Sequence, residues 1–233
     1  MNDRIAALDW PGLTASLWAR GWAATGPLLS PAECAALRES YEDDQLFRTR
    51  VVMARHRFGE GEYKYFARPV PPLVTALREA SYERLAPIAR EWNHALGIDG
   101  GFPDTHADFI ARCHQHGQAR PTPLLLRYTE GGYNCLHQDL YGKVHFPLQM
   151  VVMLNRPAED YTGGHFLLVE NRPRAQSAGE AILPGLGEAV IFTTRTRPVR
   201  GARGFYRVTV RHGVSTVTSG ERFTLGIVYH DAQ

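Results

Sequence analysis

Residues 124–140, with the sequence LLLRYTEGGYNCLHQDL, contain the pattern that decides the fold and chemistry of this chain. Two β-like runs flank Gly131 and Gly132, as expected for two strands joined by a turn. His137 and Asp139 are separated by one residue, so both side chains point to the same face of a strand. An imidazole beside a carboxylate offers two ligands to a divalent metal ion. The stretch therefore predicts a metal site carried on a β-strand.

Short β-like runs continue on both sides of this stretch from Pro121 onward, separated by Gly, Pro and Asn. The expected strands are 124–128, 135–140, 146–154, 165–169, 188–193, 206–214 and 222–229. Seven or eight short strands within about 110 residues are typical of a sandwich or an open barrel. Residues 121–233 are therefore expected to form the β core.

The first half of the chain is predicted to be mainly helical. Ser30-Pro31-Ala32-Glu33 is a capping box with proline at the first helical position. The expected elements are a helix from Pro31 to about Tyr41, a hairpin over 46–66, a helix over 73–96, and a short helix from Asp104 to near Gly117. Residues 1–120 would thus form a helical layer with a hairpin, within the same domain as the β core. The predicted fold class is α+β, with the helices packed on one sheet.

Composition is that of an ordinary globular protein, with 44% hydrophobic and 21% charged residues. No apolar run approaches the roughly 18 to 20 residues needed to cross a bilayer. The N-terminus lacks the pattern of a signal peptide. The three cysteines have no CxxC spacing and are expected to be reduced thiols. We therefore expect a cytoplasmic protein with no membrane partner and no obligate protein partner.

A third metal ligand is expected on a distant strand. His212 shares a strand face with Val208 and Val210, and a polar group on such an apolar face needs a partner. A core histidine satisfied by a hydrogen bond is the alternative. Together with His137 and Asp139, His212 would complete a set of two histidines and one carboxylate. That set leaves coordination positions open, as non-haem Fe(II) oxygenases require.

Arg222 stands ten residues after His212, at the start of the last expected strand. Thr224 and Gly226 share its face. A guanidinium at the end of a pocket can hold a carboxylate through two parallel hydrogen bonds. Thr224 could add another hydrogen bond, and Gly226 leaves room. The alternative is a surface arginine at the start of a strand.

Arginine is unusually frequent, with 24 arginines against 2 lysines, although the net charge is only +2. No acidic residue occurs between Glu188 and Glu221, where six arginines fall. They are Arg195, Arg197, Arg200, Arg203, Arg207 and Arg211. Scattered surface arginines are one explanation, and a basic patch for phosphates is the other. The segment 195–207 is expected to overhang the site. Arg48, Arg50, Arg55 and Arg57 could extend the patch.

Side chains just after the metal motif are candidates for substrate contact. Tyr141, Lys143 and His145 could meet a phosphate or stack on a base. Arg203 could contact a nucleic-acid phosphate or a small anionic metabolite. An ordinary polar loop without a substrate role is the alternative for the first three residues.

The ordered motifs of the chain resemble those of the Fe(II)- and 2-oxoglutarate-dependent oxygenase superfamily, over about residues 20–231. The motifs are HQD at 137–139, GGHF at 163–166, PGLGEAVIF at 184–192, RHGV at 211–214 and SGERFTLGI at 219–227. The resemblance implies a double-stranded β-helix core of the jelly-roll or cupin type. It also implies Fe(II) on His137, Asp139 and His212, with O2 and 2-oxoglutarate as cosubstrates.

Two branches of the superfamily share features with this chain. RYTEGGYNCLHQD resembles the AlkB-type nucleic-acid dealkylases, in which the tyrosine contacts 2-oxoglutarate. Tyr128 is therefore a candidate cosubstrate ligand, beside Arg222 and Thr224. The interval from His212 to Arg222 resembles the prolyl-hydroxylase branch instead, and the paired arginines that end the AlkB-type pattern are absent. The whole chain looks most like a bacterial family of 2-oxoglutarate oxygenases provisionally associated with nucleic-acid modification.

Three functions follow as hypotheses. The leading one is an oxygenase that hydroxylates or oxidatively demethylates alkylated DNA or RNA. The second is hydroxylation of a protein residue or a small amino acid. The third is a non-catalytic, cupin-like metal sensor, against which the expected carboxylate clamp at Arg222 argues.

Overall fold

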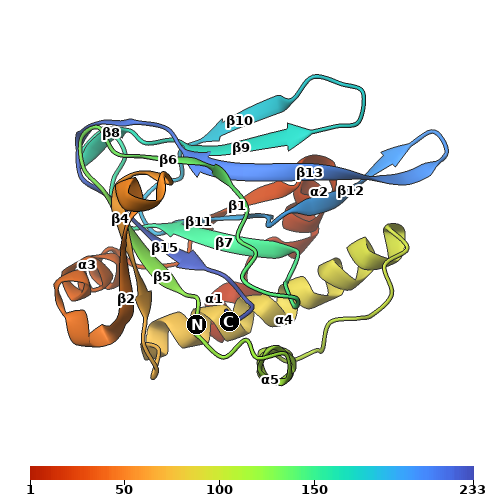
Figure 1. Ribbon diagram of the computed structural model, residues 1–233, viewed down its shortest axis with the longest axis horizontal. Coiled ribbons are helices and arrows are strands. Elements are labelled where there is room, and N and C mark those ends of the chain that lie inside the picture. Colours follow the sequence, from red (N-terminus) through yellow and green to blue (C-terminus); the bar gives the residue numbers. More distant parts are fainter.

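The computed structural model describes all 233 residues and shows two antiparallel sheets with helices beside the larger one (Figure 1). The helices are α1 (Asn2–Ala6), α2 (Trp10–Arg20), α3 (Pro31–Glu39), α4 (Pro72–Ala95) and α5 (His106–Gln115), with 3-10 turns η1 (Ser40–Glu42), η2 (Asp44–Leu46) and η3 (Met53–His56). The strands are β1 (Trp22–Pro27), β2 (Phe47–Val52), β3 (Gly59–Glu60), β4 (Glu62–Phe66), β5 (Leu124–Tyr128), β6 (Tyr133–His137), β7 (Leu148–Met153), β8 (Tyr161–Gly163), β9 (Phe166–Asn171), β10 (Ala178–Ile182), β11 (Glu188–Thr193), β12 (Thr196–Gly201), β13 (Gly204–Val214), β14 (Val217–Gly220) and β15 (Arg222–Ile227).

The two sheets are each built from strands that lie far apart along the chain. The larger sheet has the order β1-β11-β7-β15-β5-β4-β2. The smaller sheet has the order β10-β9-β13-β6-β3, and β12 pairs with β13 beside it. The strands β8 and β14 form a separate pair. From β5 to β15 the chain thus passes repeatedly from one sheet to the other, as in the expected double-stranded β-helix.

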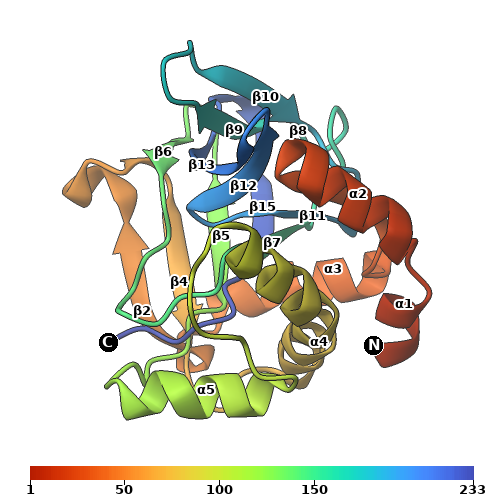
Figure 2. The same ribbon diagram turned by 90° about the vertical axis from the view of Figure 1, so that its right-hand side faces the viewer.

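The helices cover the outer face of the larger sheet, as expected (Figure 2). In α4, Leu77, Leu85, Ile88 and Trp92 recur at helical spacing and are all buried. They belong to one apolar cluster with residues of the larger sheet such as Val152. Each such side chain contributes roughly 1.5–3 kcal/mol by leaving water. The helical layer therefore supports the sheet from the side opposite the smaller sheet. No helix is both long and apolar enough to cross a membrane.

The space between the two sheets is only partly filled by apolar side chains. Val151, Phe166, Phe192 and Val210 belong to a small buried cluster there. Of these, Val151, Phe166 and Phe192 also line a cavity. The fold therefore leaves room for a site between its two sheets.

The N-terminal half contributes strands to both sheets in addition to helices. β1 pairs with β11, β4 pairs with β5, and β3 pairs with β6. The hairpin expected over 46–66 is present as β2 and β4. The sequence did not predict β1, because Ala23, Ala24, Gly26 and Pro27 have low strand propensity. Its pairing with β11 compensates for that low propensity.

Two local expectations were wrong in detail. The strand expected over 135–140 ends at His137, so Asp139 lies just beyond it. The short helix that was expected to begin at Asp104 is α5. It is capped by Thr105, whose side-chain oxygen accepts a hydrogen bond from the backbone N–H of Asp108, and not by Asp104. Asp104 instead forms an ion pair with Arg90. The short strands β8, β10, β12 and β14 were not expected either, and each is stabilised by pairing with a neighbouring strand.

Candidate active site

Two neighbouring strands bring His137 and His212 side by side. His212 of β13 lies opposite His137 of β6 in the antiparallel register, and their ring centroids are 4.2 Å apart. Asp139 Oδ2 lies 3.1 Å from His212 Nε2, and Asp139 Oδ1 lies 3.6 Å from His137 Nε2. The three residues each offer a ligand atom within 4.8 Å of the others. The structure thus brings together the three side chains that the motifs selected.

Close approach of β13 to β6 depends on Gly213. A Cβ at this position would lie 2.6 Å from the carbonyl oxygen of Asn134. The pairing register also shifts between His212 and Val214. A larger residue at 213 would push the strands apart, so the glycine next to His212 helps to hold the imidazoles together.

Hydrogen bonds orient two of the three possible ligands. His137 Nδ1 lies 2.7 Å from the carbonyl oxygen of Cys135, which can only accept, so Nδ1 carries the proton and Nε2 is free to bind a metal. The Tyr141 hydroxyl donates to Asp139 Oδ1 at 2.6 Å. The Tyr65 hydroxyl donates to Tyr141 at 3.1 Å. Asp139 is therefore held by a chain of two tyrosines.

The protonation states suit metal binding. Burial opposes ionisation of Asp139, but His212, His137 and Tyr141 stabilise the carboxylate and hold its pKa well below the usual range. Burial lowers the pKa of His212, which favours the neutral imidazole. A carboxylate and neutral imidazoles are the forms that coordinate metal ions. Two nitrogens and one oxygen are also a donor set suited to non-haem Fe(II).

Arg222 is a buried cation without an acidic partner. Its side chain begins on β15, the residue is 1% exposed, and neither Nε nor Nη1 has a hydrogen-bond partner. Arg222 lies opposite Tyr128 in register, with its guanidinium carbon 5.5 Å from the tyrosine ring centroid. An unpaired buried charge costs several kcal/mol, so this guanidinium fits an anionic ligand. The sequence-based alternative of a surface arginine does not hold.

Arg222 and the three possible metal ligands line one cavity of about 370 Å³. A cavity of this size is within the usual range for small-molecule sites. Tyr128 and Thr224 line it as well and are buried. The Tyr128 hydroxyl accepts from Asn134 Nδ2 at 3.2 Å, and burial raises the pKa of Tyr128 to about 12. Tyr128 therefore stays protonated and can donate to a carboxylate.

Several residues that line the cavity were missed in the sequence. Tyr63 and Tyr65 of β4 reach it from the N-terminal hairpin, and Phe58 follows the turn η3 beside Arg57, which was expected only as part of a basic patch. The sequence predicted only a hairpin over 46–66, and it contains no signal that Tyr63 and Tyr65 meet residues near 140. At the rim of the cavity, Phe58 is 47% exposed and Leu136 is 42% exposed.

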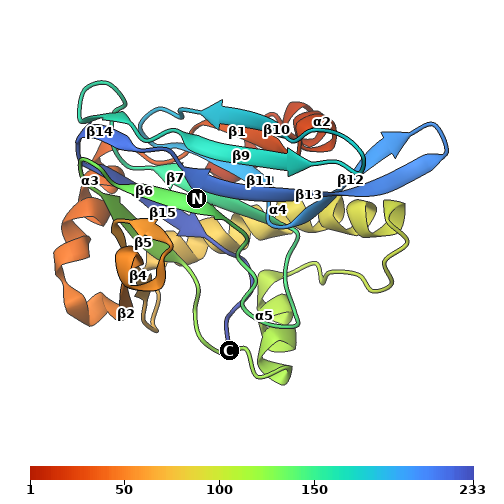
Figure 3. The ribbon, with the colours of Figure 1, turned by 45° about the horizontal axis from the view of Figure 1, so that its top comes forward.

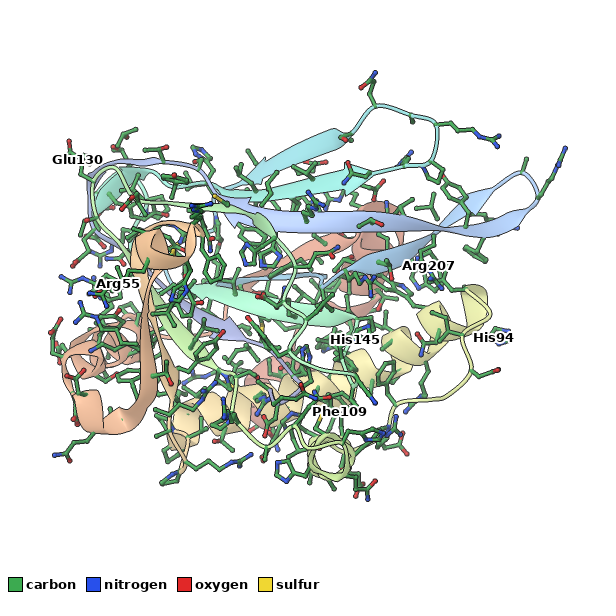
Figure 4. The ribbon with its side chains drawn as sticks, viewed as in Figure 1. Arg55, His94, Phe109, Glu130, His145 and Arg207 are labelled. Atoms are coloured by element: carbon green, nitrogen blue, oxygen red, sulfur yellow. The ribbon has the colours of Figure 1, made fainter.

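The substrate residues expected from sequence are only partly placed at the cavity. Tyr141 lines it, but its hydroxyl is occupied by Asp139. Lys143 and His145 lie in the loop between β6 and β7 and do not line the cavity; Figure 4 labels His145. Arg203 lies in the turn between β12 and β13, away from the cavity.

The expectation that 195–207 overhangs the site was therefore wrong for most of this segment. It starts close to the site, where Gln138 Nε2 contacts the carbonyl oxygen of Arg195 at 3.4 Å. The hairpin formed by β12 and the 11-residue strand β13 then leads away, and its turn projects from the body of the molecule (Figures 1 and 3). The reason is that the turn lies at the far end of β13, which begins at Gly204, eight residues before His212.

Comparison with known proteins supports the assignment that this geometry suggests. Residues 61–232 match the Oxygenase-NA family, described as an oxygenase catalysing oxidative methylation of damaged DNA. The chain belongs to this family. An uncharacterised protein of Mycobacterium tuberculosis, found in two strains, is 50% identical over 167 residues, which is 72% of each protein.

Solved structures of 2-oxoglutarate oxygenases share the fold of this family member. A Pseudomonas putida prolyl-4-hydroxylase has a TM-score of 0.56 at 15% identity, covering 96% of this chain and 99% of its own. A Trichoplax adhaerens prolyl hydroxylase has a TM-score of 0.60 at 12% identity, covering 98% and 91%. The carbocyclase SnoK of nogalamycin biosynthesis has 0.57 at 14% identity, covering 96% and 84%.

The protein is thus a 2-oxoglutarate- and Fe(II)-dependent oxygenase that uses Fe(II), 2-oxoglutarate and O2. The hypothesis of a non-catalytic metal sensor is not retained.

Proposed function

We propose that this oxygenase holds Fe(II) on His137, Asp139 and His212 and binds 2-oxoglutarate between the metal and Arg222. One observation carries the proposal: a buried guanidinium with no acidic partner and a compact set of two imidazoles and a carboxylate line the same cavity. A dicarboxylate can satisfy both ends at once. One carboxylate would approach the metal, and the other would accept from Arg222.

Two neighbours of Arg222 would complete the binding of the far carboxylate. Tyr128 keeps its hydroxyl proton and stands opposite Arg222 in the sheet. Thr224 follows two residues later on the same face of β15 and is 1% exposed. Each can donate one further hydrogen bond. Charge-assisted contacts of this kind are worth roughly 1.5–3 kcal/mol each.

When bound, Fe(II) and 2-oxoglutarate supply the activation of O2 for oxidation of a C–H bond, with succinate and CO2 as co-products. The chain itself orients these partners and excludes water. Tyr141, supported by Tyr65, fixes the Asp139 carboxylate. Cys135 fixes the ring of His137 through its carbonyl oxygen. Apolar side chains such as Phe166 and Phe192 keep this end of the cavity dry.

We infer that the substrate is an alkylated nucleic acid, from which the enzyme removes a methyl group. The description of the family supports this substrate class. The rim of the cavity also suits a base: Phe58 is exposed and stacks on His56, with ring centroids 5.3 Å apart. Arg57, beside it, makes no ion pair and could contact a phosphate. Hydroxylation of a methyl carbon on nitrogen gives a product that breaks down to formaldehyde and the free amine.

Hydroxylation of a protein residue is the second candidate. It is favoured by the ten-residue interval from His212 to Arg222, which resembles that of prolyl hydroxylases.

We place the protein in the cytoplasm, because its three cysteines form no disulfide and Cys135 is exposed.

A turnover experiment separates the two candidates. Succinate is measured after addition of a methylated oligonucleotide, the same oligonucleotide without methyl groups, or a proline-containing peptide. We expect stimulation by the methylated oligonucleotide alone, with release of formaldehyde. His137→Ala should abolish both Fe(II) binding and turnover, whereas His94→Ala, an exposed histidine on α4, should change neither. Stimulation by the peptide alone would overturn the nucleic-acid assignment.

The role of Phe58 is tested with the same substrate. Phe58→Ala should raise the KM for the methylated oligonucleotide about tenfold, because stacking of one base is worth roughly 1–3 kcal/mol. Basal succinate formation without substrate should stay unchanged, since Phe58 does not touch the metal ligands. An unchanged KM would remove Phe58 from the substrate site.

A further inference from the structure

The hairpin of β12 and β13 carries a group of arginines that the active site does not use. Arg200, Arg203 and Arg207 are exposed and form no ion pair. Arg195 before the hairpin and Arg211 further along β13 are exposed as well. In Figure 4, Arg207 lies on the hairpin side of the molecule, whereas Arg55 lies on the side of the turn η3. The hairpin therefore presents positive charge at a distance from the cavity rim.

The surroundings of the hairpin do not neutralise this charge. Glu170 on the adjacent strand β9 is already engaged by Arg172 and Arg197, each at 2.6 Å. Arg174, in the loop after β9, is exposed and unpaired and adds to the positive charge. Glu91 of α4 lines a hollow beside Phe205 but forms no ion pair with the hairpin. Some arginines elsewhere do have acidic partners, as in the pairs Arg50–Glu62 and Arg127–Glu221.

Exposed aromatic side chains stand among these arginines. Phe205 is 42% exposed and Tyr206 is 36% exposed. Phe205 is held from one side by Trp18, with ring centroids 5.6 Å apart. Arginines interleaved with aromatic rings are the combination that binds phosphates and sugars or bases of nucleic acids. An isolated anionic metabolite would need only one such cation and no ring.

The hairpin is joined to the active site by a continuous strand. His212 stands eight residues after Gly204 at the start of β13. At about 3.4 Å per residue, the hairpin turn lies about 27 Å from the metal ligand. Phosphates along one strand of a duplex repeat every 3.4 Å of axis, so this distance corresponds to about eight nucleotides. A chain of phosphates of this length can occupy both places at once.

We propose that the β12–β13 hairpin is a second contact for nucleic acid, which binds the backbone of the strand whose modified base enters the cavity. This inference rests on the proposed nucleic-acid substrate. It predicts that affinity depends on oligonucleotide length, because a short substrate reaches the cavity but not the hairpin. It also predicts that removal of hairpin arginines weakens binding through electrostatics alone.

Binding to the metal-free protein tests the proposal without turnover. Fluorescence anisotropy compares a methylated trinucleotide with a 20-nucleotide duplex that carries the modified base at its centre. The variant Arg203→Gln/Arg207→Gln should bind the 20-mer at least tenfold more weakly. The slope of log affinity against log salt should fall by about two, near one for each lost phosphate contact. The charge-reversed variant Arg203→Glu should bind the 20-mer more weakly than the neutral variant Arg203→Gln.

The controls use residues outside the hairpin and a substrate that cannot reach it. Arg84→Gln removes an exposed, unpaired arginine of α4 and should leave affinity and salt slope unchanged. Trinucleotide turnover should be the same in the wild type and in all hairpin variants. Thermal unfolding should also stay unchanged, because the substituted side chains are exposed.

Each other outcome overturns the inference in a distinguishable way. If the trinucleotide is turned over but the hairpin variants bind the 20-mer like the wild type, the hairpin contact is wrong and the proposed function stands. If neither oligonucleotide is bound or turned over, the proposed function fails and the hairpin contact with it. If phosphatidylserine vesicles bind through Arg203 and Arg207 while the 20-mer does not, the hairpin contacts a membrane instead.

Discussion

Two buried arginines, Arg78 of α4 and Arg222 of β15, have opposite surroundings. The Arg78 guanidinium donates to the carbonyl oxygens of Val228 and Tyr229 at 2.9 and 3.0 Å, and to Asp231 Oδ1 at 3.0 Å. In Arg222, two of the three guanidinium nitrogens have no partner at all. Both residues are almost completely buried, at 6% and 1% exposure.

The comparison shows that burial of a charge does not by itself indicate function. Arg78 donates through Nε and Nη2 to protein acceptors, including the Asp231 carboxylate, and ties the C-terminal segment to α4, so its role is structural. Arg222 faces a cavity, and its Nε and Nη1 lack acceptors, so the partner of these two nitrogens must come from outside the chain. The absence of an internal partner, in a place that a ligand can reach, is the property that marks a binding residue.

The largest expected effect is on the free energy of unfolding when Arg78 is replaced. Arg78→Met should lower the free energy of unfolding by about 3–5 kcal/mol, because it leaves the carboxylate of Asp231 buried with less compensation. Arg222→Met should leave the free energy of unfolding unchanged or raise it, since it removes an unpaired buried charge. Urea denaturation of both variants makes the measurement. Equal losses in the two variants would break the comparison.

The next effect concerns the cosubstrate. Arg222→Met should raise the 2-oxoglutarate concentration needed for half-maximal turnover by about 10- to 150-fold, which corresponds to roughly 1.5–3 kcal/mol for a charge-assisted contact. The 2-oxoglutarate requirement of Arg222→Lys should lie between those of Arg222→Met and the wild type, because lysine keeps the charge but loses the paired donors. Direct titration of 2-oxoglutarate into the metal-loaded protein provides a second measurement. An unchanged requirement would exclude Arg222 from the site.

A smaller effect is expected on metal affinity when the hydrogen bond from Tyr141 to the Asp139 carboxylate is removed. Tyr141→Phe should lower metal affinity about tenfold, because groups that orient a metal ligand typically contribute at least this much. Anaerobic titration with Fe(II) or Co(II) measures the change. Tyr206→Phe, at an exposed tyrosine of the hairpin, is the matched control and should have no effect. Equal affinities of Tyr141→Phe and the wild type would leave Asp139 without a positioning partner.

The smallest expected effect is on the pH dependence of stability, through His106. Burial, aided by Arg78, lowers the pKa of His106 to about 3, while its Nε2 donates to the Tyr229 carbonyl oxygen. The unfolded chain takes up this proton near pH 6.5, so the contribution of His106 is complete above pH 6.5. It is lost toward pH 3 at up to about 1.4 kcal/mol per pH unit. Burial lowers the pKa of His230 to about 3 as well, so it adds to the same loss.

Substitution at position 106 isolates this contribution. His106→Gln keeps a donor but has no titratable group, so the pH dependence of its unfolding free energy between pH 6.5 and 3 should be flatter than that of the wild type. Urea unfolding at several pH values measures both curves. Parallel curves would show that His106 is protonated in the folded protein.

Much of the site followed from local sequence, because its signals are local. The alternation of side chains along a strand places Thr224 on the face of Arg222 and His212 on the face of Val210 wherever those strands lie. Helix spacing and the capping box at Ser30 likewise gave α3 and α4 to within a few residues. The weak strands, β1 and β12 among them, depend on pairing with distant partners and were not predicted.

What the sequence alone determined is therefore the chemistry of individual faces: a histidine and a carboxylate in HQD, a third imidazole, and an arginine ten residues beyond it. The tertiary structure decided which faces meet. Tyr65 reaches Tyr141 across 76 residues, and Arg78 reaches Asp231 across 153 residues. The tertiary structure also places Arg203 away from the cavity and leaves Arg222 without an acidic partner. The physical reason is that saturation of a buried charge depends on atoms from several distant segments, which no local pattern contains.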